Sequence, residues 1–367
     1  MAEARVEGRV EPGFEPVRDA FADGFASAGE LGASAAAVVD GTLVVDLWGG
    51  SVDETGRPWQ RDTLVNVFSV TKPLAAACLL VLVERGRLAL DDAVARWWPE
   101  FEAAGKEEVT VRQVLAHQAG LDYFREQLAP DDLLDWDRAT ALLAGSPPRW
   151  PPGSTHGEHA AYYGHLVGEL VRRVDGRSLG RFLRDELAGP WQLDFHVGLG
   201  PGELTRAADV VDPDGGFRRE ALAGPEPYRL AVDNPPAMLD PAVVNSARWR
   251  EAEIPAVNGH GTARAVAQFY AGLAAGGVLD GVRLLSDDLV AQMLAAQHEG
   301  EDEVVGRHVA WGLGVQVDAE GYGLGGIGGS AGWWDTRGYA FGYATRRLGT
   351  HDCAEAVEAA LARCLER

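Results

Sequence analysis

The sequence is poor in cysteine. Only three cysteines occur among 367 residues, and their spacing matches no zinc or iron–sulfur pattern. Cys78 lies inside an apolar run and is predicted to belong to the core. Cys353 and Cys364 lie near the C-terminus, where a pair between them is left open. A reduced protein of the cytoplasm is the simplest interpretation of so few cysteines.

Long apolar runs are also missing. The N-terminal segment has charges but lacks the apolar stretch of a secretory signal peptide. The longest apolar stretch, Pro73 to Val83, is too short to cross a membrane and is soon followed by Glu84 and Arg85. We therefore expect a soluble, unprocessed protein without a membrane partner.

Positive charge is scarce relative to negative charge. The chain has 33 Lys and Arg against 55 Asp and Glu, a formal net charge of −22. Such a field repels phosphate backbones and anionic lipids, so we expect neither a nucleic-acid nor a membrane partner. A merely soluble acidic protein would explain the charge equally well.

Strand patterns occur at both ends of the chain. Two apolar runs, Ala35–Val39 and Leu43–Trp48, flank the dipeptide Asp40-Gly41, which is a strong hairpin signal. Further strands are predicted over Trp311–Val317 and Tyr339–Ala344. Between the two ends lies a long segment rich in helices and loops. This order predicts an α+β protein: an antiparallel sheet flanked by helices and built from both termini, with an inserted, mostly helical region.

The predicted domains follow from this order. The sheet domain is expected over residues 14–68 plus 245–367, and the helical region over residues 69–244. Helices are expected near residues 14–30 and 354–365. Two long excursions, residues 122–155 and 196–240, are rich in Pro with Asp or Gly, and loops of this length often shape a site.

A serine and a lysine three residues apart open the apolar helical pattern. Ser69 and Lys72 would share one helix face, and Ser69 would lie near unpaired backbone N–H groups at the helix start. The Lys72 amine can take the hydroxyl proton, provided that burial lowers its pKa. A capping serine followed by a solvated lysine gives the same pattern, but the strongly apolar helix that follows favours the catalytic interpretation.

Further motifs accompany this pair in a fixed order. They are Asn66–Lys72, Val114–Leu121, Trp150–Gly153, Gly164–Glu169, Arg172–Val174, Ile254–Arg264 and Gly325–Ser330. Over roughly residues 14–350, the chain resembles the serine β-lactamase and penicillin-binding protein superfamily, and most closely the class C β-lactamase-like family VIII carboxylesterases. The resemblance implies a β-lactamase/transpeptidase-like fold with the site in the cleft between its two parts. It also implies an acyl-enzyme on Ser69, no metal and no other cofactor.

The sequence departs from this superfamily where a catalytic tyrosine is expected. The family pattern is commonly His-Gly-Tyr-His-Ala, and the chain has Glu158 in place of the tyrosine. An unperturbed glutamate has a pKa of about 4.3 and a tyrosine one of about 10. Near Lys72 the glutamate would be held ionised, so we expect Glu158 to act as the general base. Two alternatives are a salt bridge that only fills the slot, and a displaced tyrosine at Tyr162 or Tyr163.

The family's Lys-Thr-Gly or His-x-Gly element is also altered. Leu324 occupies the place of its basic residue. The predicted oxyanion region follows and consists of Gly325, Gly326 and Ile327. Loss of the cation argues against efficient binding of β-lactams, which carry a carboxylate. Leu324 and Trp333 indicate an apolar acyl or leaving group, although ordinary core packing is an alternative for the tryptophan.

Three histidines are secondary candidates. His156 and His159 flank Glu158 and are candidates to orient it or to join proton transfer, and His260 is predicted to border the site. The leading interpretation is hydrolysis of a carboxylic ester through an acyl-Ser69 enzyme. One alternative is an ATP-independent transacylase of a natural-product pathway, which needs a second substrate as acyl acceptor. The other is a catalytically degenerate binding protein of the same fold.

Overall fold

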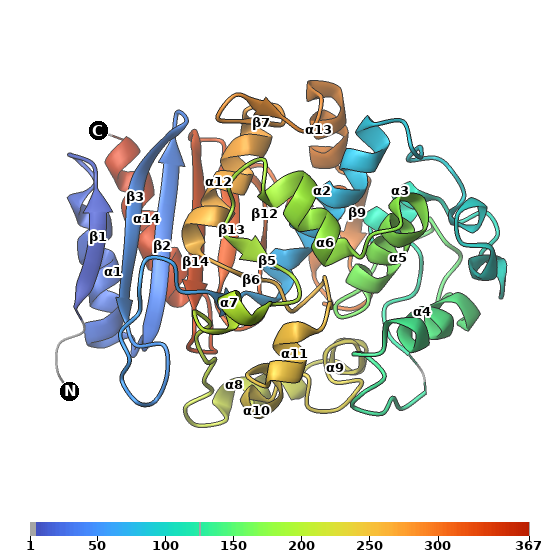
Figure 1. The fold of residues 1–367 in the computed structure, drawn as a ribbon, viewed down its shortest axis with the longest axis horizontal. Coiled ribbons are helices and arrows are strands. Elements are labelled where there is room, and N and C mark those ends of the chain that lie inside the picture. Colours follow the sequence, from blue (N-terminus) through green and yellow to red (C-terminus); the bar gives the residue numbers. More distant parts are fainter. Residues whose placement is uncertain (1–4, 125, 367) are drawn as a thin grey trace.

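The computed structural model describes residues 5–124 and 126–366 (Figure 1). One large antiparallel sheet has the strand order β1-β3-β2-β14-β13-β12-β11-β10-β9. Its strands are β1 Val6–Val10, β2 Gly32–Val39, β3 Thr42–Gly50, β9 His298–Glu301, β10 His308–Trp311, β11 Gln316–Val317, β12 Gly321–Gly325, β13 Ala331–Asp335 and β14 Tyr339–Thr345. Because β14 pairs with β2, segments from the two chain ends join in the middle of the sheet, which confirms the predicted α+β class.

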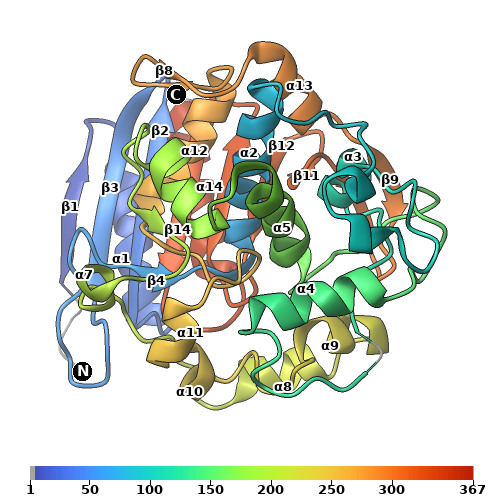
Figure 2. The ribbon, with the colours of Figure 1, turned by 45° about the vertical axis from the view of Figure 1, so that its right-hand side comes forward.

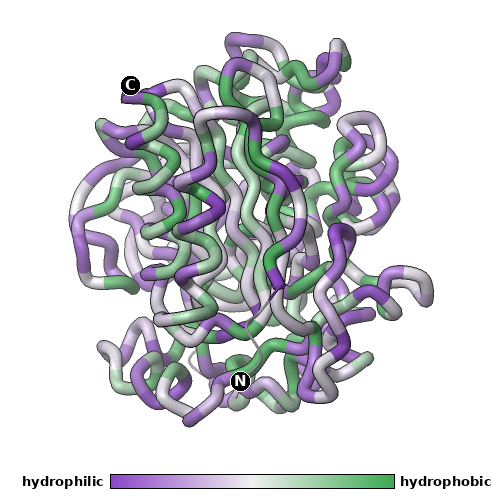
Figure 3. Tube along the Cα trace, turned by 90° about the vertical axis from the view of Figure 1, so that its left-hand side faces the viewer, coloured by the Kyte–Doolittle hydropathy of each residue, from purple (hydrophilic) through white to green (hydrophobic). Residues whose placement is uncertain are grey.

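The predicted hairpin between β2 and β3 is present. Its turn residues Asp40 and Gly41 have φ angles of 48° and 75°, the left-handed conformation that a tight two-residue turn requires. On one face of the sheet, α1 (Glu15–Ser27) packs against α14 (Asp352–Leu365) over a cluster of buried apolar side chains. Figure 3, viewed from the β1 edge, shows hydrophobic residues along the central strands and hydrophilic residues in the surrounding loops.

The other face of the sheet carries α12 (Ala263–Ala274) and, beyond it, the helical region. Nearly every side chain of α2 (Thr71–Glu84) is buried, because α5 and α6 pack against it. The remaining helices are α3 Val111–Leu115, α4 Trp136–Gly145, α5 Tyr163–Asp175, α6 Leu179–Leu183, α7 Pro201–Leu204, α8 Gly216–Leu222, α9 Glu226–Val232, α10 Pro241–Val244, α11 Ala247–Glu251 and α13 Asp287–Leu294. Short 3-10 or π turns are η1 Phe68–Val70, η2 Val94–Arg96, η3 Pro99–Glu102 and η4 Arg184–Ala188.

Two small sheets complete the fold. One joins β4 (Val65–Asn66), β6 (His260–Gly261) and β5 (Phe195–His196), and the other joins β7 (Val278–Leu279) to β8 (Val282–Arg283). The β4–β6 pairing fixes the chain just before Ser69 against the loop that precedes α12. Helices α8, α9 and α10 lie together at one end of the molecule, close to α4 (Figures 1 and 2).

The structure corrects several boundaries. The sheet starts at Val6, upstream of residue 14, because β1 pairs along β3. The single strand expected over Trp311–Val317 is two strands, since the chain turns through Gly314 (φ 80°) between them. Cys353 and Cys364 lie three turns apart on α14, too far for a disulfide, and none is present among the described residues. No helix in the described part of the chain has the length and apolar character that a membrane crossing needs.

Candidate active site

Ser69 lies in the turn η1, immediately before α2. The preceding residue, Phe68, has a φ of 48°, a left-handed conformation that costs a bulky residue on the order of 1–3 kcal/mol. Thr71 holds this turn, because its Oγ1 donates to the Phe68 carbonyl at 2.5 Å and accepts from the Gly259 N–H at 3.0 Å. The strained turn places the Ser69 side chain at the wall of a cavity, with its residue only 8% exposed.

The predicted serine and lysine are in contact, and Glu158 contacts the lysine. The Lys72 Nζ atom donates to Ser69 Oγ at 2.7 Å and lies 3.1 Å from Glu158 Oε1. The Lys72 side chain is completely buried, whereas Glu158 keeps 13% of its side-chain surface exposed and lines the cavity. Burial lowers the pKa of Lys72 below its usual range, and the Glu158 carboxylate opposes this shift. A lysine with a lowered pKa beside a serine hydroxyl can accept its proton.

A buried carboxylate holds Glu158 in position. Asp302 Oδ1 accepts hydrogen bonds from the backbone N–H groups of Glu158, Val304 and Val305 at 2.9–3.1 Å. Its Oδ2 accepts one from the Trp311 indole at 2.9 Å. Asp302 follows β9, far along the chain from Glu158, so no motif in the sequence pointed to it.

The candidate histidines lie behind the cavity wall. His159 is buried against His117, with 3.3 Å between their Nδ1 atoms, and its Nε2 accepts from the Leu121 N–H. His156 contacts His298, with 2.6 Å between their Nδ1 atoms. Burial lowers the pKa values of both candidates, that of His159 to about 3, so both are neutral near pH 7. Neither histidine lines the cavity. Their placement instead fits a structural role, in which they support the segment that carries Glu158.

His260 and the two candidate tyrosines also face away from the cavity. Nδ1 of buried His260 lies 2.8 Å from the Asn258 carbonyl. The Tyr162 hydroxyl donates to the Asn234 carbonyl, and the Tyr163 hydroxyl donates to that of Leu115. Burial raises the pKa values of both tyrosines, so neither phenol is suited to accept a proton. The placement of Tyr162 and Tyr163 argues against a displaced catalytic tyrosine at these positions.

The end of β12 lies directly beside the Ser69 turn. All four residues of the predicted element line the cavity: Leu324, Gly325, Gly326 and Ile327. A Cβ atom on Gly326 would lie 2.3 Å from the Val67 carbonyl oxygen, so only glycine permits this close approach. Ser69 and Ile327 thus both line this part of the cavity, where backbone N–H groups can stabilise an oxyanion.

The structure corrects the neighbourhood of this strand in two ways. Trp333, on β13, pairs with Gly323 and does not line the cavity, so the expected substrate contact is not made. His351, at the start of α14, does line it. A Cβ atom on Gly325 would lie 2.8 Å from His351 Nε2, which has no hydrogen-bond partner among the described residues. No sequence motif pointed to this imidazole, because it lies outside the family motifs.

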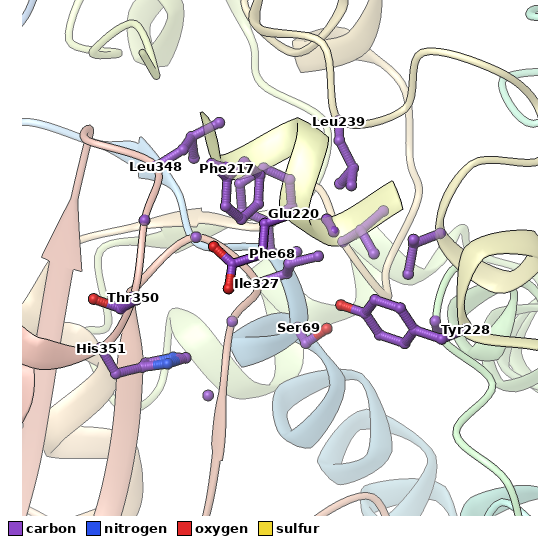
Figure 4. Close-up of a pocket in the computed structure, with 18 of the residues that line it drawn as sticks. Phe68, Ser69, Phe217, Glu220, Tyr228, Leu239, Ile327, Leu348, Thr350 and His351 are labelled. Atoms are coloured by element: carbon purple, nitrogen blue, oxygen red, sulfur yellow. The ribbon is translucent and has the colours of Figure 1, made fainter. Parts of the chain in front are cut away.

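The cavity has a volume of about 760 Å³. One wall is largely apolar and comes mainly from α8, α9 and the loop after α9, with one residue from the segment between β14 and α14: Phe217, Ala221, Tyr228, Val232, Met238, Leu239 and Leu348. Figure 4 shows Tyr228 reaching from this wall with its hydroxyl towards Ser69. These helices belong to the excursion predicted at residues 196–240, which therefore does shape the site, although its individual contact residues were not predicted.

Comparison with known proteins places this site in a family. The beta-lactamase family matches residues 17–363. The chain belongs to the beta-lactamase family. This confirms the superfamily that the motifs of the sequence resemble.

Several relatives are named as esterases or acyltransferases. Esterase/beta-lactamase LipL of Mycobacterium tuberculosis is 35% identical over 366 residues, covering 95% of this chain and 84% of LipL. A crystal structure of a family VIII carboxylesterase is 37% identical with a TM-score of 0.89, covering 98% of this chain and 100% of that one. Acyltransferase mokF of Monascus pilosus is 31% identical over 183 residues, 43% of this chain and 44% of mokF.

Two side chains of this site differ from the motifs that the sequence resembles. A carboxylate, Glu158, contacts the serine–lysine pair, and an aliphatic side chain, Leu324, packs against Val309 and Trp311 where a basic residue is expected. In the described part of the chain, no group of three or more His, Cys, Asp or Glu side chains is arranged to hold a metal ion.

Proposed function

We propose that the protein is a serine acyl-transfer enzyme that hydrolyses a carboxylic ester through an acyl-enzyme on Ser69. The observation that carries this proposal is the contact chain from Ser69 Oγ to the Lys72 amine and on to the Glu158 carboxylate. The strained turn, the glycine-dependent approach of β12 and the relatives named as esterases support the same chemistry.

The geometry supports a defined proton path. Ser69 Oγ attacks the ester carbonyl while its proton passes to Lys72, whose burial favours the neutral amine before the reaction. Glu158 stabilises the ammonium that forms and relays its proton towards the cavity, because Glu158 borders the cavity and Lys72 does not. The N–H groups of Ser69 and Ile327 stabilise the tetrahedral oxyanion. Water then attacks the acyl-enzyme with Glu158 as its general base.

Substrate preference follows from the cavity walls. Leu324 leaves the end of β12 without the cation that would meet the carboxylate of a β-lactam. The apolar wall from α8 and α9 supports an apolar acyl group instead, because such a group gains about 25 cal/mol for each Å² of apolar surface that it buries. We therefore propose a small-molecule ester with an apolar acyl part as the substrate.

Transfer to an alcohol or amine is the second candidate. The cavity of about 760 Å³ is large enough for a drug-sized ligand, and the similarity to acyltransferase mokF supports an acceptor other than water. The same acyl-enzyme serves both reactions. Product analysis with added alcohols or amines distinguishes them, because a transacylase forms the new ester or amide faster than it releases the free acid.

Intact-mass spectrometry after incubation with a p-nitrophenyl phosphonate tests the common step. We expect one adduct, assigned by peptide mapping to Ser69 and absent from Ser69→Ala. Ser154→Ala is a matched control, since Ser154 is exposed and lies outside the cavity. The alanine variant at position 69 should keep less than about a hundredth of the esterase rate, because losing a nucleophile costs several kcal/mol of transition-state stabilisation. Higher residual activity, or an adduct elsewhere, would refute the assignment.

A further inference from the structure

Tyr228 faces the proposed nucleophile from the opposite wall of the cavity. It lies on α9, and Figure 4 shows its hydroxyl directed towards Ser69. No hydrogen bond joins this hydroxyl to another described residue. The ring is only partly buried, and its neighbours on the wall are mostly apolar. A phenol in this position has an unused donor aimed at the space where a substrate would react.

The electrostatic surroundings keep this phenol protonated. Burial, and next the Glu158 carboxylate, raise the pKa of Tyr228 to about 12. Near neutral pH the group is therefore a proton donor and not a base. Of the proton-accepting groups, Lys72 contacts Ser69 directly and Glu158 contacts Lys72. What those contacts do not supply is an acid on the side of the departing alcohol.

We propose that Tyr228 is the catalytic acid that protonates the leaving-group oxygen of the ester. In this step the Ser69 Oγ–carbon bond forms, the carbon–oxygen bond to the alcohol breaks, and the phenol proton moves to the alcohol oxygen. The phenolate then regains a proton from the Lys72–Glu158 pair, which holds the proton taken from Ser69, so protons balance over acylation. The inference rests on the proposed acyl-enzyme function.

The energetics favour this direction of transfer only for poor leaving groups. An alkoxide is a much stronger base than a phenolate of pKa about 12, since even water has a pKa of about 15.7. An alkoxide therefore takes the phenol proton readily. A p-nitrophenolate is a weak base and departs without protonation. An acid at position 228 must thus matter for alkyl esters and hardly at all for p-nitrophenyl esters.

The test compares ethyl butyrate with p-nitrophenyl butyrate, which give the same butyryl-enzyme. For Tyr228→Phe, kcat/KM for the ethyl ester should fall on the order of 10²-fold or more, the usual contribution of general acid catalysis. For the p-nitrophenyl ester it should fall less than about threefold, because no proton is needed. Tyr123→Phe is the matched control: Tyr123 is also partly buried, does not line the cavity, and should leave both rates unchanged.

Each other result overturns the assignment. Equal losses for the two esters would show that Tyr228 only binds substrate or supports α9, and no loss for either would show that it is idle. If the wild-type enzyme cleaves only the p-nitrophenyl ester, it has no functional general acid, and this result also refutes the proposal. Ser69→Ala separates these results from a failure of the proposed function: if that variant keeps its activity, the acyl-enzyme itself is wrong.

Discussion

The Glu158 carboxylate lies 3.1 Å from the Lys72 amine, so a carboxylate and not a phenol stands beside the serine–lysine pair. A buried amine alone would be driven towards its neutral form, and the carboxylate draws it back towards the ammonium. This balance determines where a proton rests before and after Ser69 reacts.

Replacing Glu158 by glutamine should cripple acyl transfer. Glutamine keeps the shape of the side chain but cannot accept a proton, so a loss in kcat/KM on the order of 10²–10⁴-fold is expected for p-nitrophenyl butyrate. Glu107→Gln, on an exposed loop, is the control. If kcat/KM stays within about threefold of the wild-type value, Glu158 serves only as a structural salt-bridge partner of Lys72, because general base catalysis contributes far more. Glu158→Tyr, which restores the family residue, then shows whether the cavity still accepts a phenol.

The titration of Lys72 should shift to lower pH in Glu158→Gln. The sequence contains only two lysines, Lys72 and Lys106, so [ε-13C]lysine labelling gives two side-chain signals that NMR can follow. Lys72 should titrate below its usual pKa in the wild type, and lower still without the carboxylate that favours its ammonium form. Lys106, whose pKa burial lowers to about 8, serves as an internal control and should not move. A wild-type Lys72 that titrates at or above 10.5 contradicts the proposed base.

Gly326→Ala should strongly lower activity while leaving the fold intact. The added methyl would meet the Val67 carbonyl oxygen at 2.3 Å and push the end of β12 away from the Ser69 turn. An oxyanion donor moved by such a shift loses most of its effect, so kcat/KM should fall by about 10²-fold or more. In contrast, a Cβ on Gly202 meets nothing within 4 Å, and Gly202→Ala should be neutral. Unchanged activity in Gly326→Ala would exclude this wall as the oxyanion site.

Hydrolysis of nitrocefin should be slow. Leu324 is packed against Val309 and Trp311, so the end of β12 offers no cation to a β-lactam carboxylate. We expect a kcat/KM below about 10⁴ M⁻¹s⁻¹, the lower end for ordinary enzymes. Steady-state kinetics beside a p-nitrophenyl ester measure this directly, and a higher value would show that another group, such as the nearby His351, replaces the missing cation.

Stability should fall as pH rises through the pKa of Asp122. Burial raises the pKa of this carboxyl from 3.8 to about 7. Neither carboxylate oxygen has a hydrogen-bond partner among the described residues, although Arg149 Nε lies 3.1 Å from Asp122 Oδ2. With the folded pKa above the unfolded one, the favourable contribution is complete below pH 4 and is lost as pH approaches and passes 7.

Urea denaturation of the wild type and Asp122→Asn checks this contribution. Asparagine does not titrate, so the free energy of unfolding of the variant relative to wild type should increase by about 1–3 kcal/mol from pH 5 to pH 8. Using the difference between the two proteins cancels other groups, including the buried histidines. A difference that stays constant with pH would mean that Asp122 is ionised throughout this range.

The sequence by itself determined the parts of the protein that depend on local spacing. Asp40-Gly41 specified the hairpin because its left-handed backbone suits a tight turn, and Ser69 and Lys72 share a face because they lie one helical turn apart. These relations involve neighbours along the chain, so packing does not need to be known.

Only the tertiary structure decided which distant side chains surround that pair. Tyr162 and Tyr163, close to Glu158 in sequence, turn into the core because α5 buries them, whereas Tyr228 reaches the cavity from a separate helix. Asp302 comes from the loop after β9, and His351 from the start of α14. Such meetings depend on how helices and strands pack over long sequence separations, and hydrophobic burial, which drives that packing, is non-directional and leaves no local motif.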